Sequence, residues 1–162
     1  MYGAGAEKLG SIIKKPKSHG EGLKTVFYEN TPALAELIED LQSWFIRNKY
    51  LVGLDGRKFF CRSKKDAFNT TLQGNSAILF KRWMMKCHGW IYENGYEDFI
   101  HKMTSYHDET QWHVDVIDDD EWLAHDLGEA ACSLATSTGE DFNLNVRIDA
   151  ACKVGFNWRH CH

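Results

Sequence analysis

A polar tetrapeptide lies between two runs of residues that have the character of β-strands, and this arrangement limits how the chain can fold. The first run covers residues 99–105 and the second covers residues 110–116, and both mix aromatic and β-branched side chains with polar ones in loose alternation. Between them stands Tyr106-His107-Asp108-Glu109. Two such runs with so short a connection predict an antiparallel hairpin, which carries an imidazole and two carboxylates at its tip.

Adjacent carboxylates at the tip of a rigid hairpin suit a Mg²⁺ site. Mg²⁺ takes oxygen ligands in a tight octahedron, so it favours carboxylates whose positions the backbone fixes. Asp108 and Glu109 are therefore candidate metal ligands, with His107 beside them. A solvated turn without a catalytic role is the alternative interpretation of the same triplet.

Helices are predicted on both sides of the hairpin. Thr31-Pro32 is typical of a helix start, an N-cap followed by Pro in the first position, and predicts a helix that runs to Phe45. Ser63 to Asp66 resembles a capping box with Asp in place of Glu, and it opens the longest predicted helix, residues 64–93, which Asn94-Gly95 closes. Shorter helices are expected over residues 7–14, 23–28 and 118–138, with a loop over residues 15–22.

Two further strands complete the expected layout. One covers residues 58–62 after a glycine-rich turn, and the other covers residues 144–150, where polar and apolar side chains alternate. The order of helices, strand, long helix, hairpin, helix and strand predicts an α+β fold, with helices packed on a small antiparallel sheet. A chain of 162 residues is long enough to bury one domain's core.

Composition limits the classes of partner. No run approaches the roughly 20 apolar residues of a membrane span, so no membrane partner is expected. Five dispersed Cys predict reduced thiols in a cytoplasmic protein. The net charge of −4 argues against nucleic-acid binding over the whole surface. The charge is nevertheless uneven, with basic runs at residues 14–17 and 57–65 and an acidic run at residues 115–121. A basic groove beside an acidic metal site would produce this pattern, and so would an ordinary solvated surface.

An amide pair follows the second basic run. Asn69 and Gln73 are four residues apart on the long predicted helix, so they lie on one face, and Arg62 stands just before that helix. Such amides also occur on ordinary helix surfaces. Amides can, however, bond the minor-groove acceptors that every base pair offers, which tests base-pair geometry without reading sequence.

These residues, in this order and spacing, resemble the motifs of the family A (polymerase I-like) DNA polymerases, and in particular those of T-odd-type bacteriophages. The resemblance extends over the whole chain, through residues 2–5, 29–33, 53–58, 62–77, 106–109 and 155–162. It implies that residues 1–50 are the carboxyl-terminal part of a fingers subdomain and that residues 51–162 are the carboxyl-terminal part of a palm. The implied fold is a small antiparallel palm sheet with a catalytic hairpin packed against long helices, plus a helical remnant of the fingers.

The resemblance also implies an activity, the template-directed addition of deoxynucleotides from dNTPs to a primer 3′-hydroxyl. Asp108 would be a ligand of the family's catalytic Mg²⁺ pair, with Glu109 in support and His107 against the primer terminus. The residues implied to contact primer-template DNA are Tyr2, Arg57, Arg62, Asn69 and Gln73.

Several parts of such a polymerase have no counterpart in this sequence. These are the first palm carboxylate, the fingers Arg and Lys that hold the triphosphate, the thumb and the exonuclease domain. We therefore expect the isolated chain to be inactive and to need an N-terminal polymerase segment or subunit, in the host cytoplasm if it is phage-encoded. The chain would be a split-gene product, or a truncated frame in which Met1 is an internal residue.

Two alternatives remain beside the polymerase. A non-catalytic DNA-binding remnant would keep the helix amides and the basic loop without the chemistry. A zinc protein would use soft ligands near the carboxyl end, namely Cys152, His160, Cys161 and His162, although no CxxC or HxxxH spacing is present.

Overall fold

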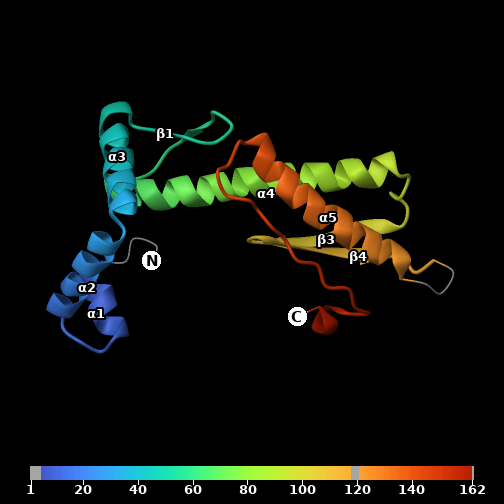
Figure 1. Ribbon diagram of the computed structural model, residues 1–162, viewed down its shortest axis with the longest axis horizontal. Helices are drawn as coiled ribbons and strands as arrows, with labels where there is room; N and C mark the ends of the chain where they lie inside the picture. The colour runs from blue at the N-terminus through green and yellow to red at the C-terminus, as the bar shows by residue number, and fades with distance from the viewer. Residues whose placement is uncertain (1–4, 118–120, 162) are drawn as a thin grey trace. The chain divides into compact units, whose positions relative to one another are not determined.

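The computed structural model describes residues 5–117 and 121–161. The chain forms two compact units, Met1–Asn75 and Ser76–His162. Helix α4 (Ala67–Glu93) begins in the first unit and ends in the second (Figure 1). Helices and small antiparallel sheets occur together, which confirms the predicted α+β class.

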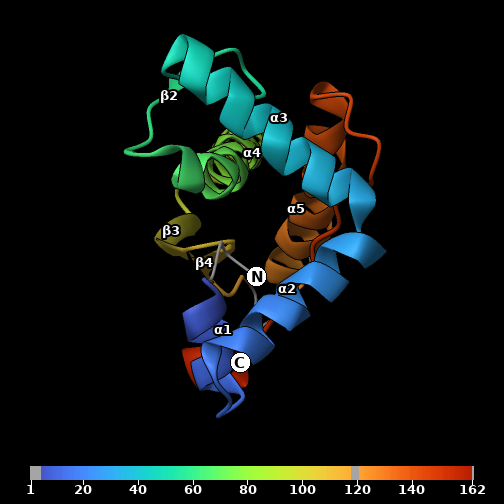
Figure 2. The same cartoon turned by 90° about the vertical axis from the view of Figure 1, so that its left-hand side faces the viewer.

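The first unit opens with two antiparallel helices, α1 (Ala6–Ile12) and α2 (Lys17–Asn30), which lie side by side (Figures 1 and 2). Their backbones meet at two buried glycines, Gly10 and Gly20, and a Cβ on Gly20 would overlap the carbonyl oxygen of Ala6. The loop predicted over residues 15–22 is wrong, because α2 already begins at Lys17 with Pro16 as its N-cap. The glycines taken for loop residues belong to the helix, where Gly20 permits close packing.

Helix α3 (Pro32–Asn48) begins where Thr31-Pro32 predicts, and it runs past Phe45. Thr31 occupies the N-cap position without capping α3 through its side chain. Its hydroxyl donates instead to the carbonyl of Phe27 in α2, at 2.7 Å, so this side chain bonds to the end of the preceding helix.

A short hairpin follows, in which β1 (Leu51–Val52) pairs with β2 (Lys58–Phe59). The strand predicted over residues 58–62 is thus only two residues long. The hairpin is fixed to the first part of α4 at two points. The backbone N–H of Leu54 donates to Asn75 Oδ1 at 3.0 Å, and Gly74 leaves room for the ring of Phe59.

The two ends of the long helix differ in how well the sequence predicts them. A 3₁₀ turn, η1 (Lys64–Asp66), precedes α4. Ser63 Oγ donates to the Asp66 carboxylate at 3.0 Å and does not cap the backbone of the turn. The predicted capping box is therefore wrong. The C-cap is confirmed. Gly95 has φ 70°, its N–H donates to the Tyr92 carbonyl, and the N–H of Tyr96 donates to the Ile91 carbonyl, which is a Schellman motif.

The second unit is built on the predicted hairpin of β3 (Ile100–Tyr106) and β4 (Glu109–Val114). A bulge interrupts their register between Lys102 and Thr104, which leaves Met103 as the extra residue. One face of the hairpin packs against α4 and α5 (Trp122–Asp141). The core consists of Ile91, Ile100, Leu123 and Leu127, with Trp90, Tyr96, Trp112, Val114 and Ile117 packed against it.

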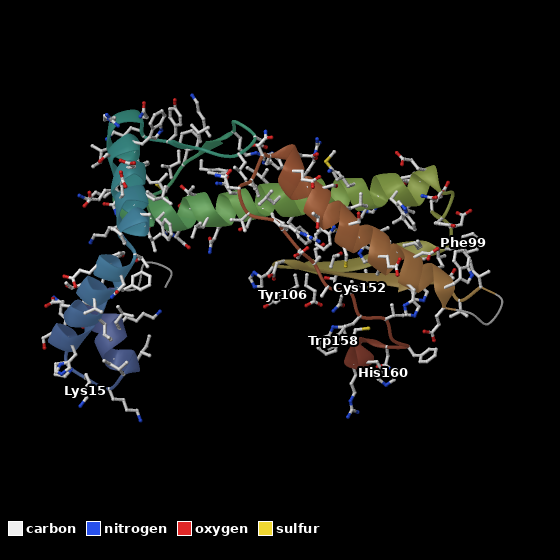
Figure 3. The ribbon with its side chains drawn as sticks, viewed as in Figure 1. Lys15, Phe99, Tyr106, Cys152, Trp158 and His160 are labelled. Carbon is white, nitrogen blue, oxygen red and sulfur yellow. The ribbon has the colours of Figure 1, made fainter. Side chains whose placement is uncertain are left out.

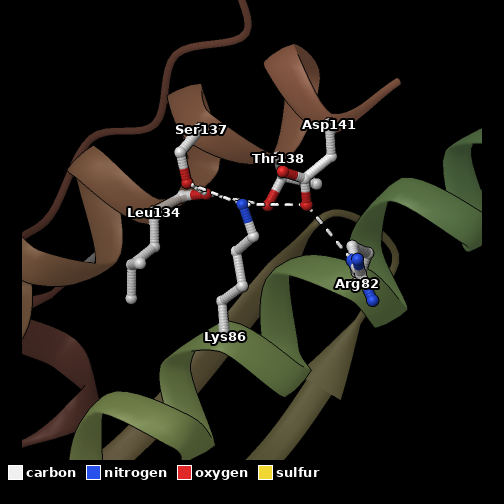
Figure 4. A network of polar contacts seen from close by, with 6 residues as sticks. All are labelled: Arg82, Lys86, Leu134, Ser137, Thr138 and Asp141. Atoms are coloured by element: carbon white, nitrogen blue, oxygen red, sulfur yellow. Dashed lines mark hydrogen bonds and ion pairs between the residues drawn. The ribbon is translucent and has the colours of Figure 1, made fainter. Parts of the chain in front are cut away.

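Helix α5, expected over residues 118–138, ends three residues later, and residues 118–120 lie outside the described ranges. A polar network joins α5 to α4 (Figure 4). Lys86 Nζ lies 2.9 Å from the Asp141 carboxylate and 2.8 Å from Ser137 Oγ, and Arg82 Nε lies 3.2 Å from the same carboxylate. Lys86, and after it Arg82, lower the pKa of the Asp141 carboxyl below its ordinary value.

The strand predicted over residues 144–150 is wrong, because this segment has no regular secondary structure. It packs on α5 instead. The Thr136 hydroxyl donates to the Ile148 carbonyl at 3.0 Å, and Gly139 leaves space for the Ile148 side chain. Further along, Cys152 Sγ lies 2.6 Å from where a Cβ on Gly128 would be, so a second glycine admits the same segment.

All five cysteines are free thiols. None of the helices within the described ranges is both long and apolar enough to cross a membrane.

Candidate active site

The β3–β4 turn is tighter than the four-residue connection that the sequence predicts, because Tyr106 and Glu109 belong to the strands. Tyr106 and Glu109 are the last register partners, so His107 and Asp108 form a two-residue connection. His107 adopts the left-handed conformation, with φ 55°, which is uncommon outside glycine and is required at the first position of tight hairpin turns. Tyr106 marks the end of β3 in Figure 3, and its ring meets the His107 imidazole edge-on, with 4.4 Å between ring centroids.

The two carboxylates at this turn differ in how they are held. Asp108 is exposed, and no side chain in the described ranges forms a hydrogen bond or ion pair with its carboxylate. Glu109 is half-buried and accepts a hydrogen bond from Gln111 Nε2 at 2.9 Å. Gln111 is a supporting residue that was not predicted from the sequence. Its signal is the two-residue period of a strand, which puts residues 109 and 111 on one face.

The donor set at the turn fits a hard divalent cation in part. Asp108 and Glu109 offer carboxylate oxygens, the ligands that Mg²⁺ prefers, from adjacent positions at the end of the hairpin. The described residues contain no group of three or more His, Cys, Asp or Glu side chains placed to hold a metal ion. That finding also lends no support to the zinc alternative at Cys152, His160 and Cys161, while His162 lies outside the described residues.

The candidate DNA-binding amides lie in the first unit. Asn69 and Gln73 are one turn apart on α4, as predicted, with Gln73 exposed and Asn69 half-buried. Asn69 Oδ1 is buried without a hydrogen-bond partner. A buried acceptor of this kind costs about 1–3 kcal/mol when it stays unbonded.

The basic candidates differ from one another. Arg62 is exposed, whereas Arg57 is already paired, with its Nη2 2.6 Å and its Nε 2.7 Å from Asp55 Oδ2. This pairing raises the pKa of the Arg57 guanidinium and lowers the pKa of the Asp55 carboxyl. Tyr2 lies outside the described residues. The hairpin tip and the first-unit candidates belong to different units, and their assembly into one site stays a prediction.

Comparison with known proteins places these motifs in a family. The family model for DNA polymerase family A matches residues 1–160. The DNA-directed DNA polymerases of Enterobacteria phage T3 and Escherichia phage T7 are 35% and 34% identical, each across 100% of this chain. The corresponding polymerase of Escherichia phage Phieco32 is 31% identical over 99% of the chain. The chain spans about a quarter of the length of these relatives.

A solved structure shows the same fold. The POL domain of Pol1 from M. smegmatis, in complex with DNA primer-template and dNTP, superposes with a TM-score of 0.77 at 17% identity, covering 91% of this chain and 26% of that one. The fold agrees with the family match, which covers nearly every residue. The chain therefore belongs to DNA polymerase family A.

Proposed function

We propose that this chain is the carboxyl-terminal part of a phage-type DNA-directed DNA polymerase, which adds deoxynucleotides to a primer 3′-hydroxyl under the direction of a template. The observation that carries the proposal is the exposed Asp108 carboxylate on a tight, left-handed turn beside Glu109, in a chain of this family. The relatives that match over its whole length bear the name DNA-directed DNA polymerase.

Within this proposal, Asp108 and Glu109 hold Mg²⁺ together with a carboxylate from an N-terminal polymerase segment or subunit. When bound, Mg²⁺ supplies charge neutralisation at the reacting phosphoryl oxygens. The chain's own contribution is positional. The left-handed backbone at His107 directs the two carboxylates, and the Gln111 amide holds Glu109 in one orientation. The His107 imidazole would contact the primer terminus.

Primer-template DNA is the proposed partner of the first-unit residues. Arg62 would contact the backbone, and Asn69 with Gln73 would bond minor-groove atoms. Tyr2 would stack near the template base. Arg57 reaches a phosphate only by leaving Asp55, so we expect Arg57→Ala to weaken DNA binding less than Arg62→Ala.

The test is primer extension by a chimera that joins this chain to the upstream three quarters of the phage T3 polymerase. Asp108→Asn should lower kcat by at least about 100-fold, because metal-assisted stabilisation of the transition state is worth several kcal/mol and each 1.36 kcal/mol is tenfold in rate. Affinity for primer-template DNA should stay unchanged. Asp98→Asn, an exposed acidic residue before β3, is the matched control and should retain full activity.

The outcomes separate the alternatives. Retained extension by Asp108→Asn would contradict the assignment of this carboxylate. A chimera that binds DNA through Arg62, Asn69 and Gln73 but never extends a primer would favour the non-catalytic remnant. Extension by the isolated chain would contradict its dependence on an N-terminal segment.

A further inference from the structure

Two imidazoles face each other across the β3–β4 hairpin, away from its tip. His101 and His113 are direct register partners on neighbouring strands. Their rings are nearly parallel, with 6.2 Å between centroids and 11° between planes. Both side chains are exposed. Directly opposed residues on antiparallel strands have Cβ atoms about 4.5–5.5 Å apart, a span that two side chains can bridge to one small ion.

A carboxylate stands behind one of these rings. Asp115 Oδ1 lies 3.6 Å from His113 Nδ1, on the same face of the strand two residues further along. A contact at Nδ1 leaves Nε2 of His113 as the nitrogen directed away from the carboxylate. This separation is longer than a hydrogen bond, so the carboxylate is near the ring without holding it. Histidine ligands of metal ions commonly donate their second N–H to such a carboxylate, and Asp115 is the group placed nearest to take that part.

The backbone beneath the pair is anchored. Trp112, which lies between Gln111 and His113 on the opposite face of β4, packs into the core of the second unit, as does Ile100 beside His101. The two imidazoles therefore project from a fixed pair of strands. Because the rings themselves are exposed, each can rotate about its side-chain bonds and turn a nitrogen toward a common ion.

We propose that His101 and His113 bind a divalent transition-metal ion of the kind that favours imidazole nitrogen, such as Zn²⁺ or Ni²⁺, with Asp115 orienting His113. Neutral imidazole suits these borderline ions and not the hard Mg²⁺. Water completes the coordination, in keeping with the absence of a group of three ligands within the described residues. Five residues of extended chain separate His113 from Asp108, roughly 17 Å, so this site is separate from the carboxylates at the tip.

The experiment uses the 162-residue chain and Ni²⁺ as the probe. Calorimetry gives the affinity and stoichiometry, and the paramagnetism of Ni²⁺ locates the ion by broadening the NMR signals of nearby imidazoles. We expect one Ni²⁺ per chain, with the His101 and His113 ring signals broadened first. Circular dichroism of each variant establishes that it is folded, and Gln at either exposed position should be accommodated without loss of structure.

The variants divide the contributions. Loss of a residue that supports a metal ligand typically costs roughly 10- to 100-fold in affinity, so Asp115→Asn should weaken Ni²⁺ binding about tenfold without changing the stoichiometry. Loss of a ligand costs more, so His101→Gln and His113→Gln should each weaken Ni²⁺ binding by more than that range. His19→Gln, an exposed histidine in the first unit, is the matched control and should leave binding unchanged.

The free thiols are the competing ligands. Cys132 and Cys152 line one cavity on α5 together with His125 and Glu129, so the double variant Cys132→Ser/Cys152→Ser should leave Ni²⁺ binding intact. The proposal is overturned if that double variant abolishes binding, if His101→Gln binds as tightly as the unmodified chain, or if other imidazoles broaden before this pair.

Discussion

The contact between helices α1 and α2 yields a prediction in which two glycines on one helix behave in opposite ways. Gly20 and Gly22 both lie within α2, two residues apart. A Cβ on Gly20 would overlap the Ala6 carbonyl oxygen and would lie 2.8 Å from the Gly10 nitrogen. A Cβ on Gly22 would meet nothing within 4 Å. The comparison of Gly20→Ala with Gly22→Ala therefore isolates helix packing from helix propensity.

The expected magnitudes follow from these distances. Alanine in place of a helical glycine stabilises a helix by about 1 kcal/mol, and both variants receive this gain. Gly20→Ala also forces the two helices apart, and because the opposing atoms are backbone, no change of rotamer relieves the overlap. Overpacking costs about 1–3 kcal/mol, and the rigidity of the contact puts this case near the upper end. We expect Gly20→Ala to lower the free energy of unfolding by about 2 kcal/mol and Gly22→Ala to raise it by about 1 kcal/mol.

Amide hydrogen exchange within α1 and α2 is the appropriate measurement, because it reports the opening of this helix pair separately from the rest of the chain. Urea unfolding followed by circular dichroism provides a second estimate. If Gly20→Ala proves as protected as Gly22→Ala, the two helices do not meet at these glycines, and the packing deduced for the start of the first unit is refuted.

Three further predictions concern helix α4 and the core of the second unit. Gly74→Ala should destabilise the chain in urea unfolding, because its Cβ would lie 2.5 Å from the Phe59 ring. Gly89→Ala on the same helix would meet nothing within 4 Å and should stabilise the chain by up to about 1 kcal/mol. Equal effects of the two variants would contradict the packing of Phe59 on α4. Leu123 is only 1% exposed, so Leu123→Ala should lower the free energy of unfolding by about 2–5 kcal/mol in the same assay. Val146 is 75% exposed, so Val146→Ala should change it by less than about 0.5 kcal/mol. A small effect at Leu123 would place this residue outside the core. Burial raises the pKa of the Cys87 thiol from 9.0 to about 12, so between these pH values the folded state keeps a proton that the unfolded state loses. The free energy of unfolding should therefore fall by about 1.4 kcal/mol per pH unit as the pH rises through this range, and Cys87→Ala should remove that part of the slope. An identical slope in both proteins would be the contrary result.

Sequence patterns succeeded where the structure depends on neighbours along the chain. The Asn94-Gly95 pair predicts a helix end because only a residue that tolerates positive φ can complete the Schellman motif there. The Thr31-Pro32 pair marks the start of α3 for a similarly local reason, since Pro fits the first helical position. The β3–β4 hairpin follows from two strand-like runs whose short connection leaves them no other partner.

The same patterns failed where an element depends on a distant partner. Residues 144–150 alternate as a strand should, yet they meet no strand edge and pack on α5, where Thr136 and Gly139 receive Ile148. Glycine in α2 predicted a loop, but the tolerance of Gly20 for close approach serves a helix contact. In both cases a tertiary contact with residues more than ten positions away along the chain prevailed over the local preference.

For the candidate active site, the order of residues alone brings His107, Asp108 and Glu109 to one end of the hairpin, because they are contiguous between two strand-like runs. The fold adds that His107 and Asp108 form the connection and that Glu109 begins β4. Which side chains are already engaged could not be known before the chain folds. The order of residues permits the pairs Gln111–Glu109 and Asp55–Arg57, which are two residues apart, and the structure shows that both form. The burial of Asn69 Oδ1 without a partner has no signal in the sequence. The reason is physical: covalent order determines proximity along a strand or helix, whereas hydrogen bonding and burial depend on the three-dimensional surroundings that form when the chain folds.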